Sequence, residues 1–295
     1  MSEPRNFGRE DILALDPRRV ADAMATALAM VSRGAAVAPI RTHIDLGGRD
    51  GTYLISGVLR ELDILTVKVI SVRPRNPESG LARLQGFLTA FEASTGQPIA
   101  TLDALAATET RTAACSAVSL RLMARPEARL LTVFGSGPQA AAHVRALCAE
   151  RPFDEVRTVK HGDGAHRRKE SLRGAGVIVT ATNSTTPVFA ATDVEPGTHV
   201  ICVGSGSAAA AEVEPGLLAR AAAIRVDHRP GCLEESGEIV QAVSAGLIEA
   251  DAVRELGEVV LGRVPGRRAA DDITFYKSVG NGTQDAALAA LLLGL

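Results

Sequence analysis

The sequence predicts an α/β protein in which an α+β region precedes a doubly wound parallel sheet. Before residue 112, short β-like runs follow one another closely, which is typical of a mostly antiparallel sheet. After residue 128, short and fully apolar runs alternate with helical segments, which is typical of a parallel sheet covered on both faces. The 295 residues are enough for two domains of ordinary size. Their boundary is expected near 112–128.

The first region begins with a helix. Asp16 is a good N-cap residue, Pro17 suits the first helical turn, and Gly34 ends the helix. Four strands are expected after it, at Thr52–Ile55, Ile64–Val72, Gly86–Phe91 and Ile99–Leu102. A second helix is expected over 104–124, ended by Pro126.

The second region contains five expected strands, at Leu130–Phe134, Val156–Val159, Val177–Thr180, His199–Val203 and Ala223–Val226. Only 17 residues, 160–176, separate the second of these strands from the third. That length is too short for the helix, strand and helix that a doubly wound sheet usually has there. We therefore expect the sheet to be shortened between its second and fourth strands.

Composition excludes several function classes. A net charge of −2 and an aromatic content of 3% argue against nucleic-acid binding, which needs basic surfaces and stacking platforms. No apolar run reaches the roughly 18 residues of a membrane helix, and the polar N-terminus does not look like a signal peptide. A cytoplasmic protein is expected. The four cysteines are scattered, so we expect buried reduced thiols and no metal site.

A glycine-rich loop follows the first apolar strand of the second region. Its residues have the pattern G-x-G-x-x-A and open a helix: Gly135, Gly137, Pro138, Gln139 and Ala140. The first glycine permits a tight turn, the second lets a pyrophosphate approach the backbone, and the alanine allows close helix–strand packing. The loop predicts a Rossmann-like dinucleotide site, and the alternative is a glycine turn that is only structural.

The tip of the next strand bears on the choice of cofactor. An acidic residue that binds the ribose 2′-hydroxyl of NAD is usual there, but this sequence has Lys160 and His161. Cations favour the 2′-phosphate of NADP, although Asp163 in the same loop could still serve NAD. A solvated loop with unrelated charges is the alternative.

Several short motifs, in this order and spacing, resemble the ornithine cyclodeaminase/mu-crystallin family of NAD(P)-dependent proteins. They are Val67-Lys68-Val69, Glu109–Ala114, the loop 135–140, Thr180-Ala181-Thr182, Val226-Asp227, Glu235–Glu238, Glu255–Glu258, Asp272–Thr274, Ser278–Gly280 and Gln284-Asp285. The resemblance implies hydride exchange between a nicotinamide and an α-amino or α-imino acid, with Thr112, Thr182 and Ser278 among the cofactor-binding residues. It also implies a homodimer formed by the N-terminal domain. The helix after Gly280 would fold back onto that domain, which gives domains 1–112 with 276–295 and 113–275.

Three cations are candidates for binding the substrate carboxylate: Arg41, Lys68 and Arg111. Lys68 interrupts an otherwise apolar strand, whereas Arg111 alone could be a surface residue and Arg41 alone carries little signal. All three match the family's carboxylate-binding positions. A cationic environment would also polarise an imine, so Lys68 is a candidate catalytic residue.

Asp227 ends an apolar strand at the edge where α/β sheets bind ligands. The resemblance implies acid–base work there, and a simple helix cap is the alternative. Leu54 departs from the family pattern, since it aligns with the glutamate that binds the distal amine of ornithine. An apolar side chain cannot compensate an ammonium, so a smaller neutral substrate or a cyclic imine is favoured.

Together these features predict an NAD(P)H-dependent reductase of a small α-imino or cyclic ketimine acid, with Asp227 as the proton donor. Two alternatives stay open. One is a cyclodeaminase or related lyase that recycles its NAD, and the other is a non-catalytic protein that binds a small molecule. The short segment 160–176 motivates the second alternative, because lost adenine contacts would weaken cofactor binding.

Overall fold

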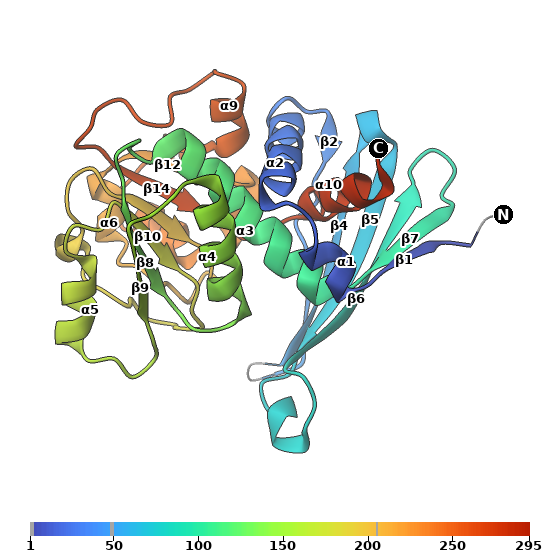
Figure 1. Cartoon of the computed structure of the whole chain (residues 1–295), viewed down its shortest axis with the longest axis horizontal. Helices are drawn as coiled ribbons and strands as arrows, with labels where there is room; N and C mark the ends of the chain where they lie inside the picture. Colours follow the sequence, from blue (N-terminus) through green and yellow to red (C-terminus); the bar gives the residue numbers. More distant parts are fainter. Residues whose placement is uncertain (1–2, 48–49, 205) are drawn as a thin grey trace. The chain divides into compact units, whose positions relative to one another are not determined.

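The computed structural model describes residues 3–47, 50–204 and 206–295 (Figure 1). The chain divides into two compact units, the first up to Arg111 together with Gly280–Leu295, and the second from Thr112 to Val279. The helix α3 (Ala104–Met123) contributes to both, because the boundary falls inside it. Its bounds confirm the helix expected over 104–124.

The first unit contains a mostly antiparallel sheet with the strand order β1-β7-β6-β5-β4-β2, in which β3 also pairs with β4. The strands are β1 (Arg5–Phe7), β2 (Ala36–Val37), β3 (Thr42–Asp45), β4 (Gly51–Leu59), β5 (Ile64–Val72), β6 (Leu84–Glu92) and β7 (Pro98–Leu102). The four expected strands are present. The first three strands along the chain were not expected, because each is only two to four residues long and shows no period-2 burial.

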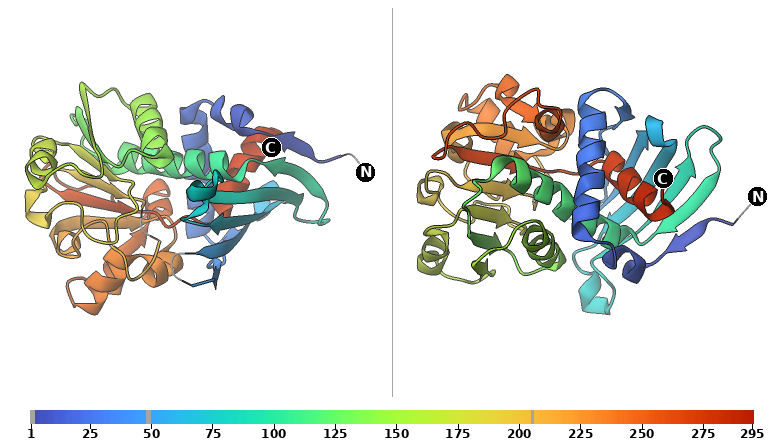
Figure 2. Two further views of the ribbon diagram at one scale, coloured as in Figure 1. Left: turned by 90° about the horizontal axis from the view of Figure 1, so that it is seen from below. Right: turned by 45° about the horizontal axis from the view of Figure 1, so that its top comes forward.

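Helices cover one face of this sheet. They are α1 (Arg9–Leu13), α2 (Pro17–Ser32) and α10 (Gly282–Leu293), with short 3₁₀ turns η1 (Arg60–Leu62) and η2 (Asn76–Ser79) between strands. Asp16 caps α2 as expected, since its carboxylate accepts a hydrogen bond from the Arg18 N–H at 2.9 Å. Helix α10 packs on β4 and β5 (Figure 2), so the C-terminal helix does fold back onto the first unit.

The second unit contains a parallel sheet with the order β13-β12-β14-β11-β10-β8-β9. The strands are β8 (Leu130–Phe134), β9 (Glu155–Val159), β10 (Val177–Thr180), β11 (His199–Cys202), β12 (Ala221–Val226), β13 (Val253–Glu255) and β14 (Ile273–Lys277). Every residue of β10, β11 and β14 is buried, so the sheet is covered on both faces. The connecting helices are α4 (Pro138–Glu150), α5 (Ala165–Leu172), α6 (Gly216–Arg220), α7 (Arg229–Glu235), α8 (Gly237–Ser244) and α9 (Leu256–Val260), with 3₁₀ turns η3 (Ala191–Asp193) and η4 (Ala250–Ala252).

The connection after β9 confirms the expected shortening. Only α5 separates β9 from β10, and β10 pairs with β8 on the side away from β9. The strand order therefore reverses at β8, which is where doubly wound sheets bind their ligands.

One expectation about the cysteines was wrong. Cys115, Cys202 and Cys232 are buried, but Cys148 is exposed on α4. All four are free thiols. Within the described ranges, the structure contains no helix that is both long and apolar enough to span a membrane.

Candidate active site

A buried cluster of charges lies inside the first unit. Lys68, on the central strand β5, is completely buried, and its Nζ lies 2.8 Å from the carboxylate of Asp285 on α10. The same Nζ donates a hydrogen bond to Thr108 Oγ1 at 3.1 Å. Lys68 occupies this position because the strand alternation that buries Thr66 and Ile70 turns it toward the helix-covered face.

Arg111 joins the same cluster from α3. Its Nη1 donates to Gln284 Oε1 at 2.7 Å, and its Nε lies 3.7 Å from Asp285 Oδ1. Gly280 packs against the guanidinium so closely that a Cβ there would lie 2.6 Å from both terminal nitrogens. Asp285 thus faces two cations, and the cluster carries one positive charge that it does not neutralise.

The surroundings of Lys68 make its ammonium easier to deprotonate. Burial lowers the pKa of Lys68 from 10.5 to about 8. The carboxylate of Asp285 opposes the shift, whereas Arg111 and Arg41 add to it by repulsion. An entering carboxylate would relieve both the repulsion and the cost of burial, so this environment suits an anionic substrate.

Arg41 lies just before β3, and its guanidinium stacks over the ring of Tyr53 at 4.8 Å from the centroid. The ring of His43 also stacks with Tyr53, at a centroid distance of 4.5 Å. Ile55 pairs with Lys68 across the sheet, so Tyr53, two residues earlier on β4, points to the same face as Lys68.

Leu54 does not join these residues. It pairs with Val69, points to the opposite face of the sheet from Lys68, and is 38% exposed. Leu54 was expected to line the substrate site together with Lys68, but the two side chains lie on opposite faces of the sheet.

The glycine loop of the second unit has the geometry of a dinucleotide loop. Gly135 has φ +125°, and a Cβ there would lie 2.4 Å from the carbonyl oxygen of Ala181. A Cβ at Gly137 would meet no atom within 4 Å, so the backbone is open to a ligand at that point. Pro138 and Gln139 form the first turn of α4, and Ala140 is buried beside the loop. These residues fit a pyrophosphate at the N-terminus of a 13-residue helix.

The loop after β9 presents its cations to solvent. Lys160 and His161 are exposed. The Asp163 carboxylate accepts a hydrogen bond from the Lys160 N–H at 2.8 Å, and it forms an ion pair with Arg167 at 3.2 Å. That backbone hydrogen bond is the main cause of the lowered pKa of Asp163. Asp163 is therefore engaged within its own loop.

Asp227 follows β12 and is 1% exposed. Its carboxylate accepts hydrogen bonds from Ser278 Oγ at 2.7 Å and from the Val279 N–H at 3.3 Å. The Ser278 hydroxyl thus orients Asp227. Thr112 is buried on α3, where its carbonyl accepts a hydrogen bond from Ser116 Oγ at 3.2 Å.

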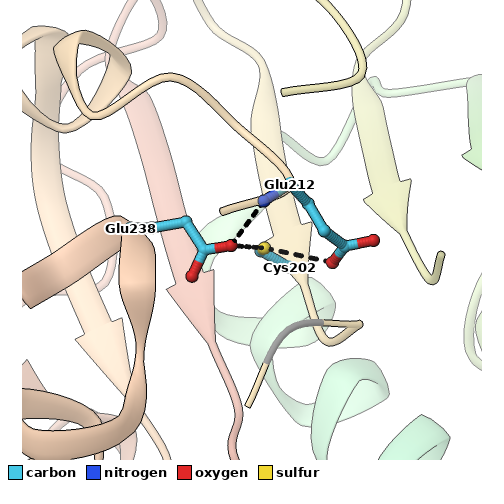
Figure 3. Close-up of side chains that lie close together, drawn as sticks. All are labelled: Cys202, Glu212 and Glu238. Atoms are coloured by element: carbon cyan, nitrogen blue, oxygen red, sulfur yellow. Dashed lines mark hydrogen bonds between the residues drawn. The ribbon is translucent and has the colours of Figure 1, made fainter. Parts of the chain in front are cut away.

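A second buried charge cluster, in the second unit, was not predicted. Cys202, Glu212 and Glu238 lie close together, and their ligand-type atoms are within 4.8 Å of one another (Figure 3). Lys277 Nζ lies 3.0 Å from Glu238 and 3.7 Å from the Cys202 sulfur. The ammonium thus provides the positive charge that a metal ion would bring. The sequence shows no motif that links these residues. They come together only in the fold, where Cys202 ends β11, Glu212 lies between β11 and α6, and Glu238 lies on α8.

The second unit also has a cavity of about 250 Å³, and its lining includes residues 221–225 of β12 together with Arg254 and Arg268. Arg254 is paired with Glu258 at 2.7 Å, and Arg225 donates to the carbonyls of Ile224 and Pro265. Most of its cationic lining is therefore engaged within the protein.

The sequence model of the ornithine cyclodeaminase/mu-crystallin family matches residues 13–167 and 163–293. The chain belongs to this family. It is 32% identical to a Delta(1)-pyrroline-2-carboxylate reductase of Bacillus cereus, over 91% of this chain and 89% of that protein. It is 29% identical to the ketimine reductase mu-crystallin of Mus musculus, over 88% of this chain and 86% of that protein. The resemblance inferred from the motifs is confirmed.

Solved structures of family members confirm the fold class. The Delta(1)-pyrroline-2-carboxylate reductase of Thermococcus litoralis, in complex with NADH and L-proline, matches with a TM-score of 0.90 and 25% identity, covering 98% of this chain and 96% of that one. The iminosuccinate reductase of Paracoccus denitrificans, in complex with NAD+, matches with a TM-score of 0.88 and 27% identity, covering 99% and 96%.

Proposed function

We propose that the protein is an NAD(P)H-dependent reductase of a small α-imino or cyclic ketimine acid. The observation that carries the proposal is the buried cluster of Lys68, Arg111 and Asp285, which holds one positive charge more than it neutralises. The relatives named above support it, because the pyrroline-2-carboxylate and iminosuccinate reductases are named for imines that bear carboxylates. The glycine loop supports a nicotinamide dinucleotide as the reductant.

Reduction of an imine adds a hydride to carbon and a proton to nitrogen. The bound cofactor would supply the hydride. Lys68, Arg111 and Arg41 would bind the substrate carboxylate, which fixes the orientation of the imine carbon next to it. Asp227, with its carboxyl group oriented by Ser278 and the Val279 N–H, is the proposed proton donor, and it would donate as the carboxylic acid and become a carboxylate.

The sheet face around Lys68 favours a substrate without a second charge. The β4 residues on that face are Gly51, Tyr53, Ile55, Gly57 and Leu59, and none of them carries a carboxylate that could pair with an ammonium. A cyclic imine or a short neutral side chain therefore suits the site better than a diamino acid.

NADP is the favoured cofactor. Lys160 and His161 are exposed at the end of β9, where the ribose of the adenosine would bind, while Asp163 is engaged inside its loop. A 2′-phosphate would find cations there and no free carboxylate.

The uncovered face of the first sheet supports a homodimer. Leu54, Val69 and Phe87 form one row across β4, β5 and β6 on the face opposite Lys68, and Phe87 is 59% exposed. Exposed apolar residues in a row mark an interaction surface, and the same face of a second copy would cover it.

The proposal is tested by following the oxidation of NADH and NADPH by the purified protein. The substrates are Δ1-pyrroline-2-carboxylate, Δ1-piperideine-2-carboxylate, and pyruvate with an amine. We expect oxidation with at least one substrate, and its loss in Arg111→Met but not in Arg33→Met, whose guanidinium forms only a surface ion pair with Glu61. No oxidation with any of these substrates refutes the proposal. Ammonia release without net oxidation would indicate a cyclodeaminase instead, and absence of cofactor binding would indicate a non-catalytic binding protein.

A further inference from the structure

Glu212 is a completely buried carboxylate that connects two strand ends of the second unit. It lies in the segment between β11 and α6. One of its oxygens accepts hydrogen bonds from the Thr182 N–H at 2.6 Å and from Thr182 Oγ1 at 2.7 Å. The other accepts from the Gly204 N–H at 2.6 Å and from Thr180 Oγ1 at 3.0 Å. Glu212 thereby holds the carboxyl ends of β10 and β11 together.

These strand ends adjoin the glycine loop. The Ala181 N–H donates to the carbonyl of Phe134, the last residue of β8, at 2.9 Å. The carbonyl of Ala181 lies against Gly135 so closely that a Cβ at Gly135 would be 2.4 Å away. Thr182 follows Ala181 directly, so the bonds from Glu212 to Thr182 also fix the chain that forms the wall of the glycine loop.

The Thr182 hydroxyl is already used inside the protein. It donates to Glu212 and accepts a hydrogen bond from the Ser184 N–H at 3.1 Å. The sequence motif suggested that Thr182 contacts the cofactor. Its bonding indicates that the side chain also holds the loop in place through Glu212.

Glu212 is itself held by a further buried layer. Its own N–H donates to Glu238 Oε1 at 2.8 Å, and Figure 3 shows the two glutamates on either side of Cys202. Glu238 accepts from Ser236 Oγ at 2.9 Å and pairs with Lys277. The backbone of Glu212 is thus fixed by hydrogen bonds and an ion pair that run through Glu238 to Ser236 and Lys277. A positioning group requires such support.

We propose that Glu212 is the positioning residue of the dinucleotide site, which keeps the ends of β10 and β11 in the arrangement that binds NAD(P). The inference rests on the proposed function, because it assumes that a nicotinamide dinucleotide binds at the glycine loop. It assigns Glu212 a role in cofactor affinity, and none in contact with the imine.

The test is the variant Glu212→Gln, which keeps the size of the side chain but turns an amide NH₂ toward groups that are themselves donors. The Kd of NADH and NADPH is measured by fluorescence titration, and steady-state kinetics are measured at saturating cofactor. We expect the Kd of the preferred cofactor to rise at least about tenfold, which corresponds to about 1.4 kcal/mol. The kcat and the KM for the imine should change less than about threefold, because neither the carboxylate cluster nor Asp227 is touched.

Glu214→Gln is the matched control. Glu214 lies two residues further on, and it accepts a hydrogen bond from the Ala191 N–H at 2.7 Å. Its removal should leave the cofactor Kd unchanged. If Glu212→Gln does not fold, Thr180→Val removes one donor from the same carboxylate with little change in shape, and should weaken cofactor binding about threefold.

The outcomes separate the two proposals. If the unchanged protein binds neither cofactor, the proposed function fails and this inference fails with it. If the unchanged protein binds NADH or NADPH, and the folded Glu212→Gln or Thr180→Val variant binds it with the same Kd, the proposed function stands and the positioning role is overturned. A lower melting temperature with an unchanged Kd would show that Glu212 serves stability alone.

Discussion

Replacing Asp285 by Asn should move the pH dependence of the reaction, because Asp285 is the carboxylate that keeps Lys68 protonated. Lys68 has a pKa of about 8, so its positive charge, and with it the affinity for the substrate carboxylate, should be lost as the pH rises through 8. We therefore expect kcat/KM to fall above about pH 8. Asp285→Asn keeps the shape of the side chain and removes the negative charge 2.8 Å from Lys68 Nζ.

The size of the shift follows from this distance. Two unit charges at 2.8 Å interact by about 6 kcal/mol at an effective dielectric constant of about 20, which corresponds to about 4 pKa units. Relaxation and entering water reduce this value, and we expect the alkaline limb to move down by at least about one pH unit. Part of the cost of an unpaired buried charge will also appear as lower stability.

The assay is the pH profile of kcat/KM for Δ1-pyrroline-2-carboxylate with the preferred cofactor. Ionisation of the imine itself affects every variant alike, so the difference between variants is the quantity to compare. Glu61→Gln removes a carboxylate from an exposed ion pair with Arg33 and should leave the limb unchanged. Lys68→Arg, which stays charged throughout, should remove the Lys68 limb even if Asp285→Asn folds poorly. A folded Asp285→Asn variant with an unshifted limb would refute the reasoning.

Three further outcomes are expected. Gly135→Ala should lower the melting temperature by several degrees and weaken cofactor binding, since φ is +125° and the new Cβ would lie 2.4 Å from the Ala181 carbonyl; unchanged thermal melting would contradict this. Phe87→Asp should convert a dimer to monomer in sedimentation, whereas Leu247→Asp, an exposed leucine of the other unit, should not. Burial lowers the pKa of His143 from 6.5 to about 4, so the unfolded chain binds more protons between these values and the free energy of unfolding should fall by up to about 3 kcal/mol as the pH drops across them. Urea titrations at several pH values measure this loss, which His143→Gln should reduce.

The strands that could be predicted are those that consist mainly of apolar and β-branched residues. Ile64–Val72 was predicted with its bounds, because seven of its nine residues are apolar or β-branched. The parallel strands were found by their short apolar runs, and the short segment 160–176 revealed that one strand was lacking. β14 was missed, although Ile273–Lys277 carries β-branched and aromatic residues.

The site was harder to predict than the fold. Lys68 could be identified because a charged side chain inside an apolar strand is costly to bury unless it has a partner or a function. Asp285 could not be assigned a role, since its partner is 217 residues away and only the packing of α10 on β5 brings the two together. Glu212 gives no signal at all in an alanine-rich segment. That Leu54 and Lys68 lie on opposite faces could not be predicted, because a sequence gives the alternation of a strand while the relative facing of two strands depends on their pairing.

The two buried lysines show why the same residue types serve different purposes. Burial by itself acts to lower the pKa of both lysines, and the neighbouring charges decide the outcome at each one. Around Lys68 the single carboxylate of Asp285 is opposed by Arg111 and Arg41, so the effect of burial prevails and the ammonium is poorly compensated. Around Lys277 the acidic groups of Cys202, Glu238 and Glu212 outweigh burial and raise its pKa. The charge of Lys277 is therefore satisfied within the protein and suits a structural role. Lys68 is paired with Asp285, but Arg111 shares the same carboxylate, so the cluster keeps one positive charge in excess that the carboxylate of the proposed substrate would neutralise.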